Sequence, residues 1–174
     1  MEYDIIIVGR GQAGLAMGYA LKKKNKHFTI LDENESAGES WRKRYDSLQL
    51  FTPRNYSQLH GFSLKGKPDG FPLKNEVVDY LERFKEENDL PVNYNQKVIK
   101  LSQENDQKFL VFTQNQRYTA KHIVIATGAF HHPFIPKIHD NSISFMIHAS
   151  DYKNPSQIPE GEVLIVGAGN TGIQ

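Results

Sequence analysis

The sequence predicts an α/β fold in which a parallel sheet with helices is joined to an antiparallel β-meander. Three observations predict it. An apolar run ending in glycine is followed by a helical pattern and a second apolar run within residues 3–31. Three short β-rich segments with polar turns between them occupy residues 98–120. An apolar run followed by glycines returns at residues 163–172, so the opening unit begins a second time.

The first unit is a predicted strand–helix–strand crossover. Residues 3–8 are a compact run rich in Ile and Val, typical of a buried strand, and residues 27–31 form a second one. Between them, residues 11–24 carry apolar side chains at helical spacing. A right-handed crossover makes the two strands parallel. The lysines at 22–24 then lie at the helix C-terminus, which favours a solvated helix end over a binding patch.

The middle of the chain is predicted to be irregular before it becomes helical again. Residues 34–75 hold scattered Gly and Pro with little periodicity, and so long an irregular stretch in a compact domain is usually functional. Asn75 is the expected N-cap of a helix that runs to about Asp89. Leu90-Pro91-Val92 ends this helix and enters another short strand.

The second half of the first domain is predicted to be a meander. Residues 98–101, 109–113 and 117–120 are expected to form three antiparallel strands, as a second layer over the helix–sheet unit. A fully apolar strand at residues 123–126 follows. Half of the 8 prolines then lie between residues 128 and 161, which predicts an extended connection. Residues 163–166 are predicted to form one more strand.

The first glycine loop follows the first strand directly and opens the first helix. Its residues are Gly9-Arg10-Gly11-Gln12-Ala13-Gly14, a G-x-G-x-x-G pattern. In such a loop the first glycine makes the tight turn, the second lets the backbone approach a pyrophosphate, and the third allows close helix–strand packing. Asp32 ends the second strand 23 residues after Gly9, near the spacing of about 20 expected for a carboxylate that binds a ribose hydroxyl. The alternative is an ordinary tight turn with a capping acid.

A second glycine loop is Gly167-Ala168-Gly169-Asn170-Thr171-Gly172. The sequence ends two residues later, so we expect no helix after this loop and an incomplete second unit. We interpret the chain as a fragment or truncated product; the alternative is an accidental motif. We therefore predict three parts: a first domain at 1–130, a connection at 131–162, and the first strand and glycine loop of a second domain at 163–174. Two such loops predict two nucleotide cofactors, FAD at the first and a nicotinamide cofactor at the second.

Composition narrows the class of protein further. The formal net charge of +1 provides no field that would gather nucleic acid or an anionic membrane, so neither is expected as a partner. The first apolar run is too short for a secretory leader or a membrane helix, and a cytoplasmic location is the expectation. The absence of Cys excludes disulfides, thiolate metal sites and cysteine nucleophiles from these residues.

The ordered set of motifs resembles the flavin-containing monooxygenase-like flavoproteins, in which an FAD domain carries an inserted NADPH domain. The resemblance covers essentially all 174 residues. It includes the first loop with Asp32, the segment Gly38-Glu39-Ser40-Trp41, the run from Trp41 to Pro53, the segment Ala126-Thr127-Gly128 and the second loop.

The resemblance implies roles for individual residues. Asp32 is expected to hold the adenosine ribose, with Glu33 as its neighbour, and the backbone of Val98 is expected to meet the adenine. Gly38, Ser40 and Trp41 are implied beside the pyrophosphate and ribityl chain, and Thr52 near the isoalloxazine. The alternatives are a core or capping aromatic for Trp41 and a strand-end hydroxyl for Thr127. The full set of implied cofactor-binding residues is Gly9, Gly11, Gln12, Ala13, Gly14, Asp32, Glu33, Gly38, Ser40, Trp41, Thr52, Val98, Ala126, Thr127, Gly128, Gly167, Gly169, Asn170, Thr171 and Gly172.

One stretch departs from the family pattern, which has Phe-x-Gly-x-x-x-His followed by an aromatic residue before the second loop. His148 and Tyr152 match it, whereas Ser142 and Ser144 stand at the Phe and Gly positions. This departure leaves oxygenating and simpler reductase members open. A loop histidine with a local hydrogen bond is the alternative for His148. His131 and His132 are expected to be structural or exposed, no metal site is expected, and no catalytic residue is assigned.

The lack of Cys separates this chain from the disulfide reductases that resemble it, because both stretches where those enzymes carry a redox dithiol are cysteine-free here. We therefore expect a parent enzyme that depends on FAD and NADPH, with NADH as the alternative, and that oxygenates a small molecule at the flavin C4a carbon. The 174 residues alone are expected not to turn over NADPH. The alternative is a silent flavin-binding or apo module that self-associates through residues 163–166.

Overall fold

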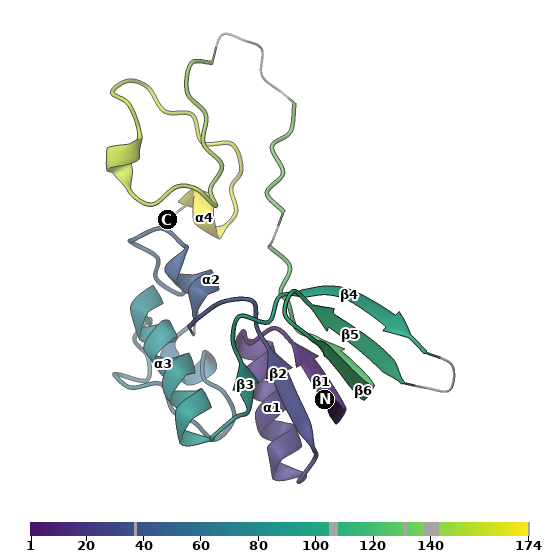
Figure 1. The fold of residues 1–174 in the computed structure, drawn as a ribbon. Coiled ribbons are helices and arrows are strands. Elements are labelled where there is room, and N and C mark those ends of the chain that lie inside the picture. The colour runs from purple at the N-terminus through teal and green to yellow at the C-terminus, as the bar shows by residue number, and fades with distance from the viewer. Residues whose placement is uncertain (37, 105–107, 131, 138–142, 174) are drawn as a thin grey trace.

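The computed structural model describes residues 1–36, 38–104, 108–130, 132–137 and 143–173. Six strands form one sheet in the order β3-β2-β1-β6-β5-β4 (Figure 1). The elements in chain order are β1 (Glu2–Val8), α1 (Gln12–Lys23), β2 (Phe28–Leu31), α2 (Glu39–Arg42), the 3-10 turn η1 (Arg54–Tyr56), α3 (Lys74–Glu87), β3 (Val92–Asn93), β4 (Val98–Gln103), β5 (Phe109–Thr113), β6 (Arg117–Ile125), the 3-10 turn η2 (Pro155–Gln157) and α4 (Asn170–Ile173).

The parallel half of the sheet confirms the predicted crossover. β1 is parallel to β2 on one side and to β6 on the other, with Ile6 opposite Thr29 and Ile123. Because successive side chains of a strand point to opposite faces, Ile7 belongs to the core cluster that α1 and α3 cover, while Ile6 belongs to a second cluster. Both side chains are fully buried.

The meander is antiparallel as predicted, but two details differ. Residues 117–120 and 123–126 are not separate strands: the backbone runs straight through Lys121 and His122 as β6. Because β6 pairs with both β1 and β5, the meander is hydrogen-bonded into the parallel sheet and is not a separate sheet. Val111 and Tyr118 nevertheless pack in the same cluster as Ile6, so the meander covers the second face of β1.

The long helix α3 begins earlier than predicted. Its N-cap is Leu73, and Asn75 lies inside the first turn. The Glu76 carboxylate accepts a hydrogen bond from the Leu73 N–H at 2.8 Å, so a side chain three residues inside the helix satisfies a donor at its start. Upstream, residues 34–75 hold two single-turn helices, α2 and η1, and the isolated bridges that join Gln49 to Leu73 and Leu59 to Phe62.

The two corrections at the end of the chain concern residues 163–166 and α4. Residues 163–166 are not a strand, because no other described segment pairs with them, and their side chains are 62–84% exposed. Contrary to the expectation of no helix, Asn170–Ile173 form one helical turn. The Gly172 N–H donates to the Gly169 carbonyl at 2.9 Å, so the glycine loop starts this turn by itself.

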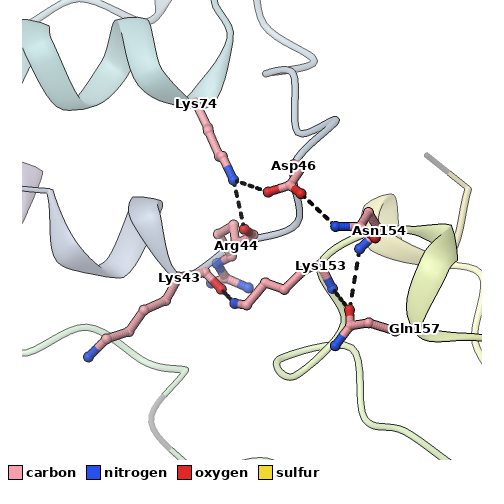
Figure 2. A network of polar contacts seen from close by, with 7 residues as sticks. All are labelled: Lys43, Arg44, Asp46, Lys74, Lys153, Asn154 and Gln157. Carbon is pink, nitrogen blue, oxygen red and sulfur yellow. Dashed lines mark hydrogen bonds and ion pairs between the residues drawn. The ribbon is translucent and has the colours of Figure 1, made fainter.

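A polar network ties the late segment around η2, residues 153–157, to residues 43–46 and the start of α3 (Figure 2). The Asp46 carboxylate accepts hydrogen bonds from Lys74 Nζ at 3.0 Å and from Asn154 Nδ2 at 2.8 Å. The Asp46 N–H donates to the Lys153 carbonyl at 2.8 Å, and Lys153 Nζ donates to the Lys43 carbonyl. Since Lys74 is itself buried, the segment is anchored on the first turn of α3.

Candidate dinucleotide site

The turn between β1 and α1 requires glycine at two of its positions. Gly9 has φ of +99°, and a Cβ there would lie 2.5 Å from the Ala126 carbonyl oxygen. A Cβ on Gly14 would lie 2.0 Å from the Gly9 carbonyl oxygen. Non-bonded atoms do not approach so closely, so both positions are closed to any side chain. The first and third glycines therefore make the turn and the tight helix–strand packing that the sequence predicts.

The middle glycine has a different environment. A Cβ on Gly11 would have no neighbouring atom within 4 Å, and its φ of −70° is open to every residue type. Gly11 is the N-cap of α1, yet no side chain caps the helix, and Gln12 and Ala13 are exposed. The first N–H groups of a helix have no intrahelical acceptor and carry the positive end of its dipole. The loop is thus an open, uncapped helix start suited to an anion.

Asp32 stands where the ribose carboxylate is expected, at the end of β2 beside the loop. It is 8% exposed. One carboxylate oxygen accepts the Arg10 N–H at 2.8 Å, and the other accepts the N–H and side-chain amide of Asn34 at 3.0 and 2.9 Å. These contacts fix the carboxylate against the first loop. The Gln96 N–H donates to the Asp32 carbonyl at 2.8 Å, which brings the residues before β4 to the same edge of the sheet.

Beside Asp32 lies a polar depression of about 660 Å³. Glu33, the implied neighbour of the ribose carboxylate, is on its wall and pairs with Lys97 at 3.5 Å, one residue before Val98. The depression is thus lined by residues next to the two implied positions, Glu33 beside Asp32 and Lys97 beside Val98. The remaining lining residues are Asn34, Lys43, Asn95, Gln114 and Asn115.

The segment Ala126-Thr127-Gly128 is brought against the first loop as expected. The Ala126 N–H donates to the Val8 carbonyl at 2.8 Å, and the Gly9 position is closed by Ala126 itself. Gly128 has φ of +84°, so the chain turns away from the sheet at this glycine. Figure 1 shows the chain leaving the sheet after β6 toward the segment around η2.

The residues of the α2 segment and Thr52 differ in how closely the protein surrounds them. Gly38 has φ of +72°, and a Cβ there would lie 2.8 Å from a methyl group of Val78. Trp41 packs against the main core cluster, which matches the alternative given for it, and Ser40 is exposed. Thr52 is also exposed, and its hydroxyl accepts a hydrogen bond from Ser57 at 3.0 Å.

The second loop repeats the backbone geometry of the first. Gly167 has φ of +113°, and a Cβ on Gly172 would lie 2.3 Å from the Gly167 carbonyl oxygen. That Cβ would also lie 3.6 Å from a methyl group of Ile165, just as a Cβ on Gly14 would meet Ile7 at 3.5 Å. Gly169, like Gly11, has no atom within 4 Å of a Cβ position. Asn170 and Thr171 begin α4.

The residues before the second loop show local contacts. His148 Nδ1 lies 2.9 Å from the Ser150 hydroxyl and accepts the Ser150 N–H at 3.1 Å, which agrees with the alternative of a loop histidine. The Tyr152 ring lies 6.5 Å from that of Tyr45. Ser144 and His132 are exposed, whereas Ser142 and His131 lie outside the described residues.

Sequence reasoning missed Arg10, whose side chain is among the most buried polar groups at 4% exposure. Its Nη2 donates to the Ser36 carbonyl, and its guanidinium lies 4.9 Å from the centre of the Tyr94 ring. The available signal was a charged residue between two glycines, directly after a buried strand.

Parallel strands with an open glycine turn after the first and a carboxylate at the end of the next are the arrangement typical of dinucleotide-binding α/β proteins. The family model of the pyridine nucleotide-disulphide oxidoreductases matches residues 6–174, so the chain belongs to this family. Its resemblance to flavin monooxygenase-like members is confirmed by the relatives described next. Among the described helices, none has both the length and the apolar character needed to cross a membrane.

Three relatives illustrate the similarity. An uncharacterized CzcO-like oxidoreductase of Geobacillus kaustophilus is 48% identical over 173 residues, which are 98% of this chain and 49% of the relative. A probable indole-3-pyruvate monooxygenase of Arabidopsis thaliana, YUCCA1, is 29% identical over 97% of this chain and 42% of its own length. A mutant flavin monooxygenase from Stenotrophomonas maltophilia superimposes with a TM-score of 0.90 at 28% identity, over 98% of this chain and 52% of that protein. The chain spans about half the length of curated relatives such as the Geobacillus protein.

Proposed function

We propose that this chain binds FAD at the first glycine loop and contributes the FAD-binding part of an NADPH-dependent flavin monooxygenase. The observation that carries the proposal is the contrast within one loop: Gly9 and Gly14 are closed by backbone atoms, while Gly11 faces open space at an uncapped helix start. Folding alone explains the need for glycine at Gly9 and Gly14. The glycine at position 11 is explained by a ligand whose pyrophosphate approaches the backbone.

The proposed roles follow the positions of the residues along one sheet edge. The N–H groups at Gly11, Gln12 and Ala13 bind the pyrophosphate, and Asp32 accepts a hydrogen bond from the adenosine ribose. Glu33 stands beside Asp32 at the ribose, the backbone of Val98 borders the adenine, and Ala126–Gly128 close the loop from the other side. For Gly38, Ser40, Trp41 and Thr52 the proposed place, nearer the flavin, rests on the family resemblance. When bound, the flavin would supply hydride acceptance and reaction with oxygen.

The second loop is proposed to belong to the nicotinamide site, with Gly167, Gly169, Asn170, Thr171 and Gly172 around the NADPH pyrophosphate. Its turn repeats the first one, but residues 163–166 pair with no described strand and are exposed. Because no described strand pairs with residues 163–166, the described residues supply no sheet edge along which the rest of a dinucleotide would lie at this loop. We therefore propose that the 174-residue chain does not oxidise NADPH, even with FAD added.

The test of the proposal is a comparison of FAD with FMN. Flavin fluorescence is titrated with the purified chain for each ligand. FMN lacks the adenosine and the second phosphate, so tight binding of FAD with weak binding of FMN is expected. Equal affinities, or no binding of either flavin, would contradict the proposed site. NADPH consumption in air by the chain with FAD would contradict only the proposal of inactivity.

A silent self-associating module is the second candidate, and the exposure of residues 163–166 favours it. Leu164, the most exposed of the four, is 84% exposed. An unpaired apolar segment of this kind is a site for pairing with a second copy. Light scattering of the chain and of Leu164→Asp tests this: a dimer that becomes a monomer on substitution supports self-association, and a monomer in both counts against it.

A further inference from the structure

Carboxamide side chains dominate the wall of the polar depression beside Asp32. A carboxamide presents a hydrogen-bond donor and an acceptor side by side and carries no charge. Of the charged residues on the same wall, Lys97 and Glu33 pair with each other at 3.5 Å. The wall therefore suits a neutral ligand edge on which donors and acceptors alternate. The four carboxamides are Asn34, Asn95, Gln114 and Asn115.

Three of these four residues have a role in the fold. Asn34 Nδ2 donates to the Asp32 carboxylate at 2.9 Å. Asn115 Nδ2 donates to the Asn95 carbonyl at 2.8 Å. Asn95 itself has φ of +55°, in the left-handed region where asparagine is several times more common than most other residues. Folding thus accounts for the residue type at all three positions.

Gln114 is the exception on this wall. Within the part of the chain that the structure describes, its side-chain amide has no hydrogen-bond partner, whereas Gln116 in the same turn donates from Nε2 to the Tyr118 hydroxyl. The backbone of Gln114 is nevertheless held in place, because its N–H donates to the Lys97 carbonyl at 3.2 Å. A long polar side chain that is fixed at its base and unengaged at its tip is available to a ligand.

The position of Gln114 indicates which part of a ligand it meets. Gln114 directly follows Thr113, and Thr113 lies opposite Val98 in the register of β4 and β5. The backbone of Val98 is the proposed border of the adenine. The edge of adenine carries the 6-amino donor next to a ring-nitrogen acceptor, and a glutamine amide pairs with both at once: its oxygen accepts from the amino group and its nitrogen donates to the ring.

We propose that Gln114 is a base-recognition residue that reads the 6-amino group and a neighbouring ring nitrogen of the adenine. This inference rests on the proposed FAD site and deepens it, because it assigns the choice of base to a side chain of the β5–β6 turn. The glycine loop and Asp32 contact phosphate and ribose, which are common to all nucleotides. Gln114 adds a contact that only the base can make.

The test compares ADP with purine riboside 5′-diphosphate, in which hydrogen replaces the 6-amino group. The affinities of both are measured by isothermal titration for the unsubstituted chain and for Gln114→Ala. The unsubstituted chain should prefer ADP, and the ratio of the two affinities should fall about fivefold in Gln114→Ala, as for one hydrogen bond. Both probes are diphosphates, so a phosphate contact from the glycine loop or from Lys43 cancels in this ratio.

Gln103→Ala is the matched control. Gln103 is also an exposed carboxamide next to β5, but it lies opposite Phe109, at the other end of the β4–β5 pair from Thr113. Its substitution should leave both affinities unchanged. Gln114→Met keeps the length of the side chain and removes both hydrogen-bonding groups. It should lower the ratio as Gln114→Ala does, and it provides a second variant if Gln114→Ala does not fold.

Three results would overturn the inference. An unchanged ratio in both Gln114 variants would mean that the residue does not contact the amino group. Equal losses for ADP and its analogue would mean that Gln114 only shapes the turn, and the same fall in Gln103→Ala would make the effect nonspecific. If FAD and ADP bind and the ratio ignores Gln114, the inference alone fails; if neither FAD nor ADP binds, the proposed function fails with it.

Discussion

The substitution Gly11→Ala tests whether glycine at this position is required for FAD binding or for the stability of the fold. The added methyl group would meet no atom within 4 Å, and the backbone conformation of φ −70° and ψ −173° is ordinary for alanine. Two small effects on the free energy of unfolding oppose each other. Alanine is a poorer N-cap than glycine by about 0.5–1 kcal/mol, and it reduces the entropy of the unfolded chain by about 0.4–1 kcal/mol. We expect a net change within about 1 kcal/mol.

The same methyl group should nevertheless weaken FAD binding strongly. If the pyrophosphate lies against the Gly11 backbone, a Cβ displaces it from the helix N–H groups, and an affinity loss of about tenfold or more is expected, equivalent to about 1.4 kcal/mol. Gly14→Ala is the contrasting variant. Its Cβ would lie 2.0 Å from the Gly9 carbonyl oxygen, so the loop must shift, at an overpacking cost of about 1–3 kcal/mol or more.

The assay combines urea unfolding of each variant with titration of FAD fluorescence. Gly11→Ala should unfold like the unsubstituted chain and bind FAD poorly, whereas Gly14→Ala should lose both stability and binding. A Gly11→Ala variant that binds FAD with unchanged affinity would refute the reasoning, because nothing would then approach the middle glycine.

Two further predictions concern carboxylates of the first domain. Asp32→Ala leaves the N–H groups of Arg10 and Asn34 without their acceptor, and should lower the free energy of unfolding by about 1–3 kcal/mol in urea; an unchanged midpoint would show that these contacts add no stability. Asp46→Ala should release the segment around η2, so that a protease at neutral pH cleaves this segment faster. Mass spectrometry of the fragments measures the cleavage rate. A rate like that of the unsubstituted chain would count against the tether. Hydrogen bonds from Asn154 and Lys74 lower the pKa of Asp46. Because the pKa of Asp46 is lower in the folded than in the unfolded chain, its ion pair and hydrogen bonds stabilise the tether fully above the unfolded-state pKa. This stabilisation is lost as pH falls through the folded-state pKa. The tether should therefore be insensitive to pH above about 5 and weaken below about 4.

The sequence was most informative where the structure is determined locally. The close approach of Gly14 to Gly9 was predictable because it lies within one turn of the chain, whereas the contact that closes Gly9, with Ala126, is distant in sequence. The second loop supports this, since Gly167 and Gly172 adopt the same turn although none of the described strands pairs with residues 163–166. Asp32 was predictable for a related reason, because its place at a strand end is fixed by the crossover.

Features that depend on distant partners were not predictable in this way. Residues 163–166 have the composition of a strand, but a strand also needs a neighbour, and no described segment provides one. The start of α3 was misplaced because Glu76, and not the N-cap side chain, satisfies the first donor. The contact between Asp46 and Lys74 joins residues 28 apart, and no local pattern announces it.

The measurement that tests the central claim most directly is the visible absorption spectrum of the chain. The purified protein is mixed with excess FAD and passed over a desalting column, with Gly11→Ala treated in the same way. If the first loop binds FAD, a flavin band elutes with the unsubstituted chain and is lost or strongly reduced in Gly11→Ala. A folded chain that elutes colourless after incubation with FAD would contradict it.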